Sequence, residues 1–368
     1  MELLQAAFLE APPLKLTDIL HTPKEASMFN ENIVFTILRI IVNHGGEGFK
    51  KFEDDLQKNQ PTTPQKIKLH KTELHPLPAW NIDESTIIGN AEVDEAIIKE
   101  LQLDKIPDFW KKVRFQGGDQ LSLARLRSIE SIRAGQVGGY HGFFFFAMLP
   151  RLFHGKIADI HGILTVHFGK PNSGAQNPGS LCFHNTRLDR LPITMSSLPS
   201  FRACRDIVFV SLYARVLHCL LRVSSCQTLE EYLDKFQTWN SLVSHARQIQ
   251  NTFGNPEIVE ELRWKRKRST EKSKDGKVTQ GDMVYENAVL FLRDALISRE
   301  YTDAIKAGDS GRVLLVLKIW ALSFRGNGRT KYAYEMLHVI HNLTNVFPKG
   351  IRLVKFYCYT IVKIYKVK

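Results

Sequence analysis

The sequence predicts a mixed α/β fold that is predominantly α-helical, with a small βα core sheet and a large helical C-terminal half. Two short apolar runs, at 112–116 and 143–149, are each followed by an amphipathic helical pattern. Strand and helix alternating at this spacing argue for a parallel sheet. Few later segments have strand character, so we expect the sheet to be small. The composition, 43% hydrophobic and 24% charged, is ordinary for a globular protein.

The 368 residues divide into five expected regions. These are a helical N-terminal region at 1–60, a connector and short helix at 61–104, a small α/β core at 105–195, a helical region at 196–348 with a basic insertion at 263–280, and an atypical basic tail at 349–368. In the first region the apolar stripe ENIVFTILRIIVN ends at HGGEG, which is typical of a helix terminator. The connector is rich in proline and polar residues.

The α/β core is expected to consist of two successive strand–helix units. The first has a strand at 112–116, a turn at Gly117–Gly118–Asp119 and a helix at 121–134. The second has a fully buried strand at 143–149 and a helix at 156–168. The polar segment 177–192 follows, and we interpret it as a structural loop. Its Cys182 and His184 lack the two further ligands that a zinc site needs.

The remainder is expected to form successive helices at 206–222, 225–253, 255–268, 283–307, 310–324 and 329–343, with Asp309 as an N-cap. The most apolar run, Ile207–Leu221, is interrupted by Arg215 and His218. We expect it to form a buried helix that is too short to span a bilayer, so no membrane partner is expected.

The net charge of +12 is carried by two stretches. Residues 263–277 and 349–368 each contribute six net positive charges, which leaves the rest of the chain formally neutral. A neutral body with basic appendages predicts local nucleic-acid contacts at most. Five cysteines without a CxxC pair and an acidic residue at position 2 indicate an intracellular protein, in the nucleus or cytoplasm.

Several blocks resemble a known family. They include LPAWNIDESTIIGNAEVDEAI, GGDQLSLARLR, LFHGKIADIHG, NPGSLCFHNTRLDRLPI and LKIWALSFRGNGRTKYAYEMLHVIHNL, which occur in order between about residues 75 and 350. The chain is similar there to an uncharacterised fungal (basidiomycete) family, domain-of-unknown-function family 6589. The resemblance implies no established activity, and the many copies of the family suggest mobile-element ancestry. Members look longer, so the ending LVKFYCYTIVKIYKVK is expected to mark a truncated copy or an intron read-through.

Asp119 is the first candidate catalytic residue. An acid just beyond a strand lies where ligands bind in open α/β sheets, and it could hold a metal or move a proton. The competing interpretation is a helix N-cap, with Gly117 and Gly118 making the turn. His154 follows the second strand at the matching position, so parallel adjacent strands would place it at the same sheet edge as Asp119.

Asp119, Asp159 and Glu286 occur in the order of the three acids of ribonuclease H-like transposases. With His154 they form a hypothetical catalytic set, in which Asp119 and Asp159 would bind a divalent metal such as Mg²⁺. The topology fits poorly, because a helix pattern directly follows Asp119 and Asp159 falls inside a helix.

Two basic groups are candidates for binding phosphate or nucleic acid. Arg312, Arg325, Arg329 and Lys331 flank the helix at 310–324, where they could hold phosphate or pair with Asp303, Asp309 or Glu335. Lys265, Arg266, Lys267 and Arg268 open the basic insertion, which could be a solvated loop, a nuclear-import signal or a nucleic-acid tether.

Two functional hypotheses follow. The first is a mobile-element-derived protein with a divergent metal-dependent nuclease core, and the second is a non-catalytic helical scaffold that binds nucleic acid or protein. An Asp119 carboxylate bonded to backbone amides would favour the second.

Overall fold

The computed structural model describes residues 7, 9–68, 75–133, 141–170, 175–272, 282–348 and 351, with the backbone alone at 269–272. The basic tail and residues 273–280 of the basic insertion therefore lie outside the described residues, apart from Ile351. The chain forms two compact units, each assembled from segments that are distant in sequence. Unit 1 comprises Met1–His21, Thr63–Lys156 and Ile305–Lys368, and unit 2 comprises Thr22–Thr62 and Ile157–Ala304.

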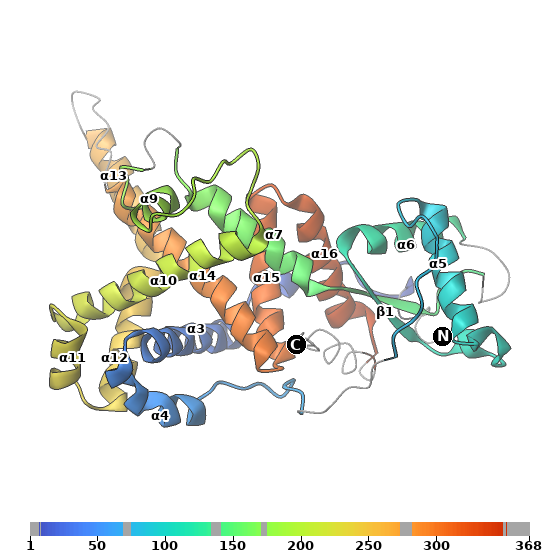
Figure 1. Cartoon of the computed structure of the whole chain (residues 1–368), viewed down its shortest axis with the longest axis horizontal. Helices are drawn as coiled ribbons and strands as arrows, with labels where there is room; N and C mark the ends of the chain where they lie inside the picture. Colours follow the sequence, from blue (N-terminus) through green and yellow to red (C-terminus); the bar gives the residue numbers. More distant parts are fainter. Residues whose placement is uncertain are drawn as a thin grey trace. The chain divides into compact units, whose positions relative to one another are not determined.

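Unit 1 contains the sheet. Its elements are α2 (Leu16–Ile19), α5 (Ile87–Glu100), η2 (Leu103–Lys105), η3 (Phe109–Lys111), β1 (Arg114–Gly118), α6 (Gln120–Ile132), β2 (Phe146–Pro150), the start of α7 (Leu152–His167), α15 (Ser310–Gly326), α16 (Thr330–His341) and η5 (Asn342–Val346). Figure 1 shows α5 and α6 side by side next to β1, and these two helices also contact each other.

The two strands pair in parallel, from Arg114 opposite Phe146 to Gly118 opposite Pro150. The predicted class, mostly helical with a small parallel sheet, is confirmed. The predicted strand ends are wrong at both runs. Gly117 and Gly118 belong to β1, because the ladder continues until the Arg151 amide donates to the Gly118 carbonyl at 2.8 Å.

The second apolar run begins as a turn and not as a strand. Phe143 has a left-handed backbone with φ of 56°, and the Phe146 amide donates to its carbonyl at 3.0 Å. The strand therefore starts only at Phe146, and its burial alternates along the run. Phe143 and Phe145 are buried against Phe109 and the apolar face of α6, so burial of the run does not need strand geometry.

Unit 2 is a helical assembly. Its elements are α3 (Pro23–His44), η1 (Glu47–Phe52), α4 (Glu53–Lys58), the rest of α7, α9 (Leu181–Arg187), α10 (Phe201–Ser224), α11 (Leu229–Lys235), α12 (Trp239–Ile249), η4 (Gln250–Gly254), α13 (Glu257–Lys272) and most of α14 (Met283–Lys306). The segment 225–253 is not one helix, since Thr238 starts α12 as an N-cap for the Ser241 amide. The segment 177–192 contains α9, which Ser180 caps.

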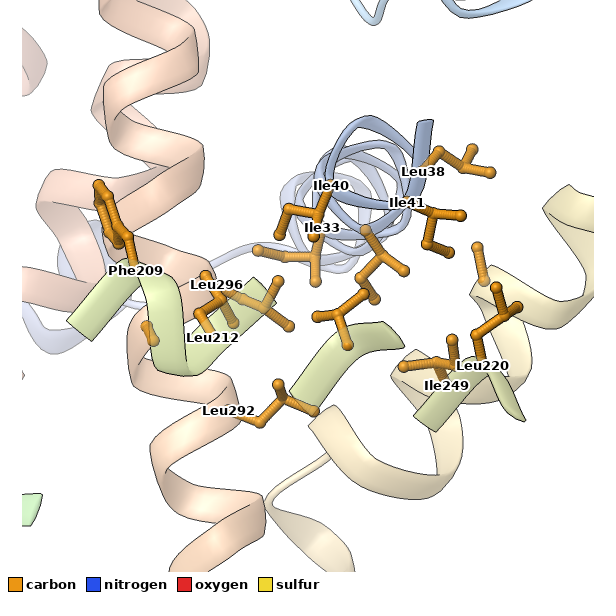
Figure 2. Packing of buried hydrophobic residues seen from close by; sticks show 14 of the residues in the cluster. Ile33, Leu38, Ile40, Ile41, Phe209, Leu212, Leu220, Ile249, Leu292 and Leu296 are labelled. Carbon is orange, nitrogen blue, oxygen red and sulfur yellow. The ribbon is translucent and has the colours of Figure 1, made fainter. Parts of the chain in front are cut away.

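The core of unit 2 surrounds α3. Its residues from 32 to 42 are buried on every side except at Arg39, which is typical of a central helix. Figure 2 shows Ile33, Ile40 and Ile41 of α3 with side chains from α10, α12 and α14 around them, Leu212, Ile249 and Leu296 among those labelled. Burial of many such side chains, each contributing about 1.5–3 kcal/mol, stabilises this unit.

The helix that covers this core, α10, is longer than its apolar run. By length and composition it is the one helix in the described part of the chain that could cross a membrane, although 39% of its apolar window is buried inside the protein. Ile207, Val208 and Val216 are among its residues in the core cluster. The prediction of a buried helix is therefore confirmed for that face. The apolar run lies within a helix of 24 residues, which is longer than the run itself.

Candidate functional site

Asp119 stands at the carboxyl end of β1 and caps α6. Its backbone is extended, and its carboxylate accepts a hydrogen bond from the Ser122 amide at 2.8 Å. That bond is the main cause that lowers the pKa of Asp119 below its ordinary value. Asp119 therefore forms the capping hydrogen bond that one of the two competing interpretations requires. A carboxylate engaged in this way remains ionised and is already partnered.

His154 and Tyr332 accompany Asp119 in unit 1. The charge of His154 is a lesser contributor to the lowered pKa of Asp119, and Asp119 in turn contributes to a raised pKa of Tyr332, whose main cause is burial. His154 is exposed and follows shortly after Pro150, the residue of β2 that pairs with Gly118. The parallel pairing therefore brings Asp119 and His154 to one sheet edge.

Arg151 lies over this edge. A Cβ added at Gly117 would come within 2.7 Å of the Arg151 Nε, so glycine leaves room for that side chain. The edge thus combines an exposed arginine, an exposed histidine and a capping carboxylate.

The other two acids of the predicted catalytic set belong to unit 2. Asp159 is buried in α7, where it adds to the raised pKa of Tyr301, an effect caused mainly by burial. Glu286, in the first turn of α14, is buried and accepts bonds from Arg266 Nη1 at 2.8 Å and Arg263 Nε at 3.3 Å. Within the described ranges, no group of three or more His, Cys, Asp or Glu side chains is placed to hold a metal ion.

The predicted phosphate site around α15 is altered by burial. Asp309 caps α15 as expected, accepting from the Arg312 amide at 3.2 Å, and it also accepts from the Thr63 amide at 2.8 Å. Arg312 itself is fully buried at 0% exposure, unlike the exposed Arg325 and Lys331. A phosphate-binding role for Arg312 stays a prediction.

The remaining basic residues near α15 are more accessible. Arg325 and Lys331 are exposed, while Arg329 donates to the Asn327 carbonyl at 3.3 Å. The acids proposed as their partners are used elsewhere. Glu335 forms a bidentate pair with Arg127 at 2.8 and 2.6 Å, which ties α16 to α6. Asp303 pairs with Arg299 at 3.0 Å and Arg39 at 3.3 Å.

The four basic residues Lys265–Arg268 lie on α13, where the helix divides them between two faces. At 100° per residue, Arg263 and Arg266 point the same way, toward Glu286. Trp264, Lys265 and Arg268 occupy the opposite arc, whereas Lys267 lies only about 40° from Arg263 around the helix. All four side chains are exposed. Trp264 is 56% exposed, and the Arg268 guanidinium lies over its ring at 4.3 Å from the centroid. Figure 1 shows α13 in light orange near α9.

One polar cluster was not predicted as a site. Arg215 of α10, His184 of α9 and Ser211 meet in unit 2, with His184 Nδ1 2.8 Å from Ser211 Oγ and Arg215 Nη2 3.5 Å from His184 Nε2. A single arginine inside an otherwise apolar helical run was the available signal, because a charge there is buried when the helix packs.

These features define a predominantly helical protein in which a small parallel sheet ends at a capping carboxylate and one helix exposes a basic, aromatic face. The family of unknown function DUF6589 matches residues 8–359, and the chain belongs to this family. No curated protein and no solved structure matches the chain.

Proposed function

We propose that this protein binds single-stranded nucleic acid through four exposed side chains of α13: Trp264, Lys265, Lys267 and Arg268. The observation that carries the proposal is the exposed Trp264 ring with the Arg268 guanidinium stacked on it at 4.3 Å. Exposed aromatic rings are platforms on which bases stack, and arginine adds charge and a second stacking plane.

The electrostatics of α13 support the same surface. Arg263 and Arg266 share the Glu286 carboxylate, and Arg263 also lies 3.4 Å from Glu260, so both arginines already have acidic partners. Lys265 Nζ is 3.8 Å from Glu261 Oε2, and both side chains are well exposed. Such an exposed ion pair contributes little to stability. Lys267 and Arg268 carry no ion pair among the described side chains and can contact phosphates, with release of counterions.

The proposal takes the second of the two functional hypotheses in preference to the nuclease. The nuclease hypothesis needs Asp119 as a metal ligand and Glu286 as a third acid. Asp119 already caps a helix, and Glu286 is buried against two arginines. Both carboxylates therefore have structural partners, which supports a binding protein.

The test is fluorescence anisotropy with a labelled single-stranded oligonucleotide of mixed sequence. Loss of base stacking in Trp264→Ala is expected to weaken binding about tenfold, since each stacked base contributes about 1–3 kcal/mol. The double variant Lys267→Glu, Arg268→Glu is expected to weaken it further.

The matched control is Lys24→Glu, Lys58→Glu, which makes the same charge change at two exposed lysines of α3 and α4. It is expected to bind within about twofold of the wild type once the salt concentration is fixed. Equal losses in the control and the α13 variants would refute a specific α13 surface, and so would a wild type without affinity for the oligonucleotide.

A further inference from the structure

Unit 2 contains an arginine whose surroundings hold no counter-charge. Arg215 of α10 donates from Nη2 to the Gly179 carbonyl at 3.0 Å, and its Cζ lies 4.6 Å above the centre of the Phe291 ring. Its Nη1 is inaccessible to solvent and has no hydrogen-bond partner in the part of the chain that the structure describes. No ion pair of those residues includes Arg215.

The other polar neighbours of Arg215 are neutral. Burial, with a smaller effect of the Arg215 charge, lowers the pKa of His184 to about 4, so the imidazole is uncharged near neutral pH. Burial raises the pKa of the Cys219 thiol to about 12, so this group is no thiolate. The positive charge of Arg215 is therefore opposed only by a carbonyl dipole and a ring face.

Arg215 is only partly exposed. A partly buried charge without a partner is unfavourable, and proteins normally place an acid or a bound ion beside it. The segment over the guanidinium lies at the surface, since Ala175, Gln176 and Pro178 are exposed. Gly179 also touches the first turn of α14, where an added Cβ would come 3.1 Å from Val284 Cγ1. Glu286, which anchors α13, belongs to the same turn.

We propose that Arg215 is the centre of an oxyanion-binding site in unit 2, in which a phosphate group accepts a hydrogen bond from the unpartnered Nη1. A guanidinium presents parallel N–H donors that match the oxygens of phosphate. Two sources share this chemistry: a small phosphate-bearing molecule, and the backbone of the nucleic acid proposed to bind α13. The site itself does not depend on that proposed function.

The first experiment is thermal melting of the full chain with inorganic phosphate as the probe, at constant ionic strength maintained with chloride. The wild-type Tm is expected to rise with the logarithm of the phosphate concentration, because a ligand that binds the folded state stabilises it. Arg215→Gln is expected to lose this slope. Without phosphate its Tm is expected to equal or exceed that of the wild type, since the variant removes an unopposed, partly buried charge.

The control is Arg222→Gln, two turns further along α10, where Arg222 lines a surface cleft together with His218. It is expected to keep the wild-type slope. A flat wild-type response, or equal slopes in the wild type and Arg215→Gln, would overturn the site. So would a slope lost only in Arg222→Gln, or an Arg215→Gln variant that melts earlier at every phosphate concentration with its slope intact.

A second arm identifies the source of the anion. If Arg215→Gln loses the phosphate slope and also binds the oligonucleotide several-fold more weakly, the site takes backbone phosphate. If it loses the slope and binds the oligonucleotide like the wild type, the site takes a small phosphate compound. The double variant Lys267→Glu, Arg268→Glu is expected to retain the dependence of Tm on phosphate. The proposal for the α13 surface and the proposal for the Arg215 site can therefore be refuted independently.

Discussion

Asp119 is the residue on which both functional hypotheses depended. Its carboxylate bonds the Ser122 amide, and this contact predicts a purely structural response to mutation. Asp119→Ala is expected to lose about 1 kcal/mol of unfolding free energy in urea denaturation, while Asp119→Asn, which can still cap, is expected to lose only a few tenths. If Asp119→Asn loses as much unfolding free energy as Asp119→Ala, stability depends on the negative charge of Asp119 and not on its capping hydrogen bond.

The same variants separate a cap from a metal ligand. Addition of Mg²⁺ is expected to change the Tm of wild type and Asp119→Ala equally, because a cap has no linkage to metal. A rise in wild-type Tm that disappears in Asp119→Ala would restore the nuclease hypothesis.

Asp94 predicts a pH dependence of stability. Burial raises the pKa of Asp94 from 3.8 to about 7, against a weaker lowering by the hydrogen bond from Gln116 Nε2. The folded state therefore holds a proton that the unfolded state releases above pH 4, so this group makes the protein less stable as pH rises from about 4 to 7. Above pH 7 Asp94 is ionised in both states, and the full free-energy cost of burying its charge remains.

Asp94→Asn keeps the side chain neutral at every pH. It is expected to exceed the wild type by about 1–3 kcal/mol in unfolding free energy at pH 8. The difference should fall toward zero near pH 4. Burial likewise raises the pKa of Glu130 to about 7, so only the difference between variant and wild type isolates Asp94. A pH-independent difference would contradict this assignment.

At the scale of elements, the attachment of α13 depends on one carboxylate. Glu286 of α14 receives Arg263 and Arg266, of which the Arg263 side chain is 46% exposed and therefore screened. Glu286→Gln is expected to cost about 1–2 kcal/mol, below the range for a fully buried pair. Amide hydrogen exchange in α13 is expected to accelerate.

The control for this prediction is Glu261→Gln, which removes the exposed partner of Lys265. It is expected to leave both stability and α13 exchange unchanged within about 0.5 kcal/mol. Unaltered exchange in Glu286→Gln would show that α13 is held by its apolar contacts.

Element identity was predictable from sequence where the pattern is long, and element ends were not. The stripe at 31–43 lies in α3, and the helix indeed ends at HGG, with Gly45 as the cap residue and Gly46 at φ of 104°. At β1 the local turn chemistry of two glycines was overridden by pairing with β2. At 225–253 the high helical propensity predicted one continuous helix, although α12 begins after a break at Thr238. A single threonine favours capping only in the context of its neighbours.

At the scale of the whole molecule, the charge of +12 matters for binding through its position. If α13 contacts phosphates, the logarithm of the affinity for single-stranded oligonucleotide falls linearly with the logarithm of salt concentration. Lys267→Glu, Arg268→Glu is expected to reduce this slope by about 1.4, which corresponds to two phosphate contacts. Anisotropy titrations at several salt concentrations give the slope, and the Lys24→Glu, Lys58→Glu control should leave it unchanged.

The sequence by itself determined the helical class, the parallel pairing of two short strands, the N-cap at Asp309 and the basic stretch that includes α13. It offered the N-cap at Asp119 as one of two interpretations. These features depend on local patterns of side chains spaced along one segment. Tertiary structure decided which acids and arginines meet: Glu335 with Arg127, Glu286 with Arg263 and Arg266, and Arg215 with no acid among the described residues. Such pairs join residues from different helices, and the charge and burial that define them exist only once those helices pack.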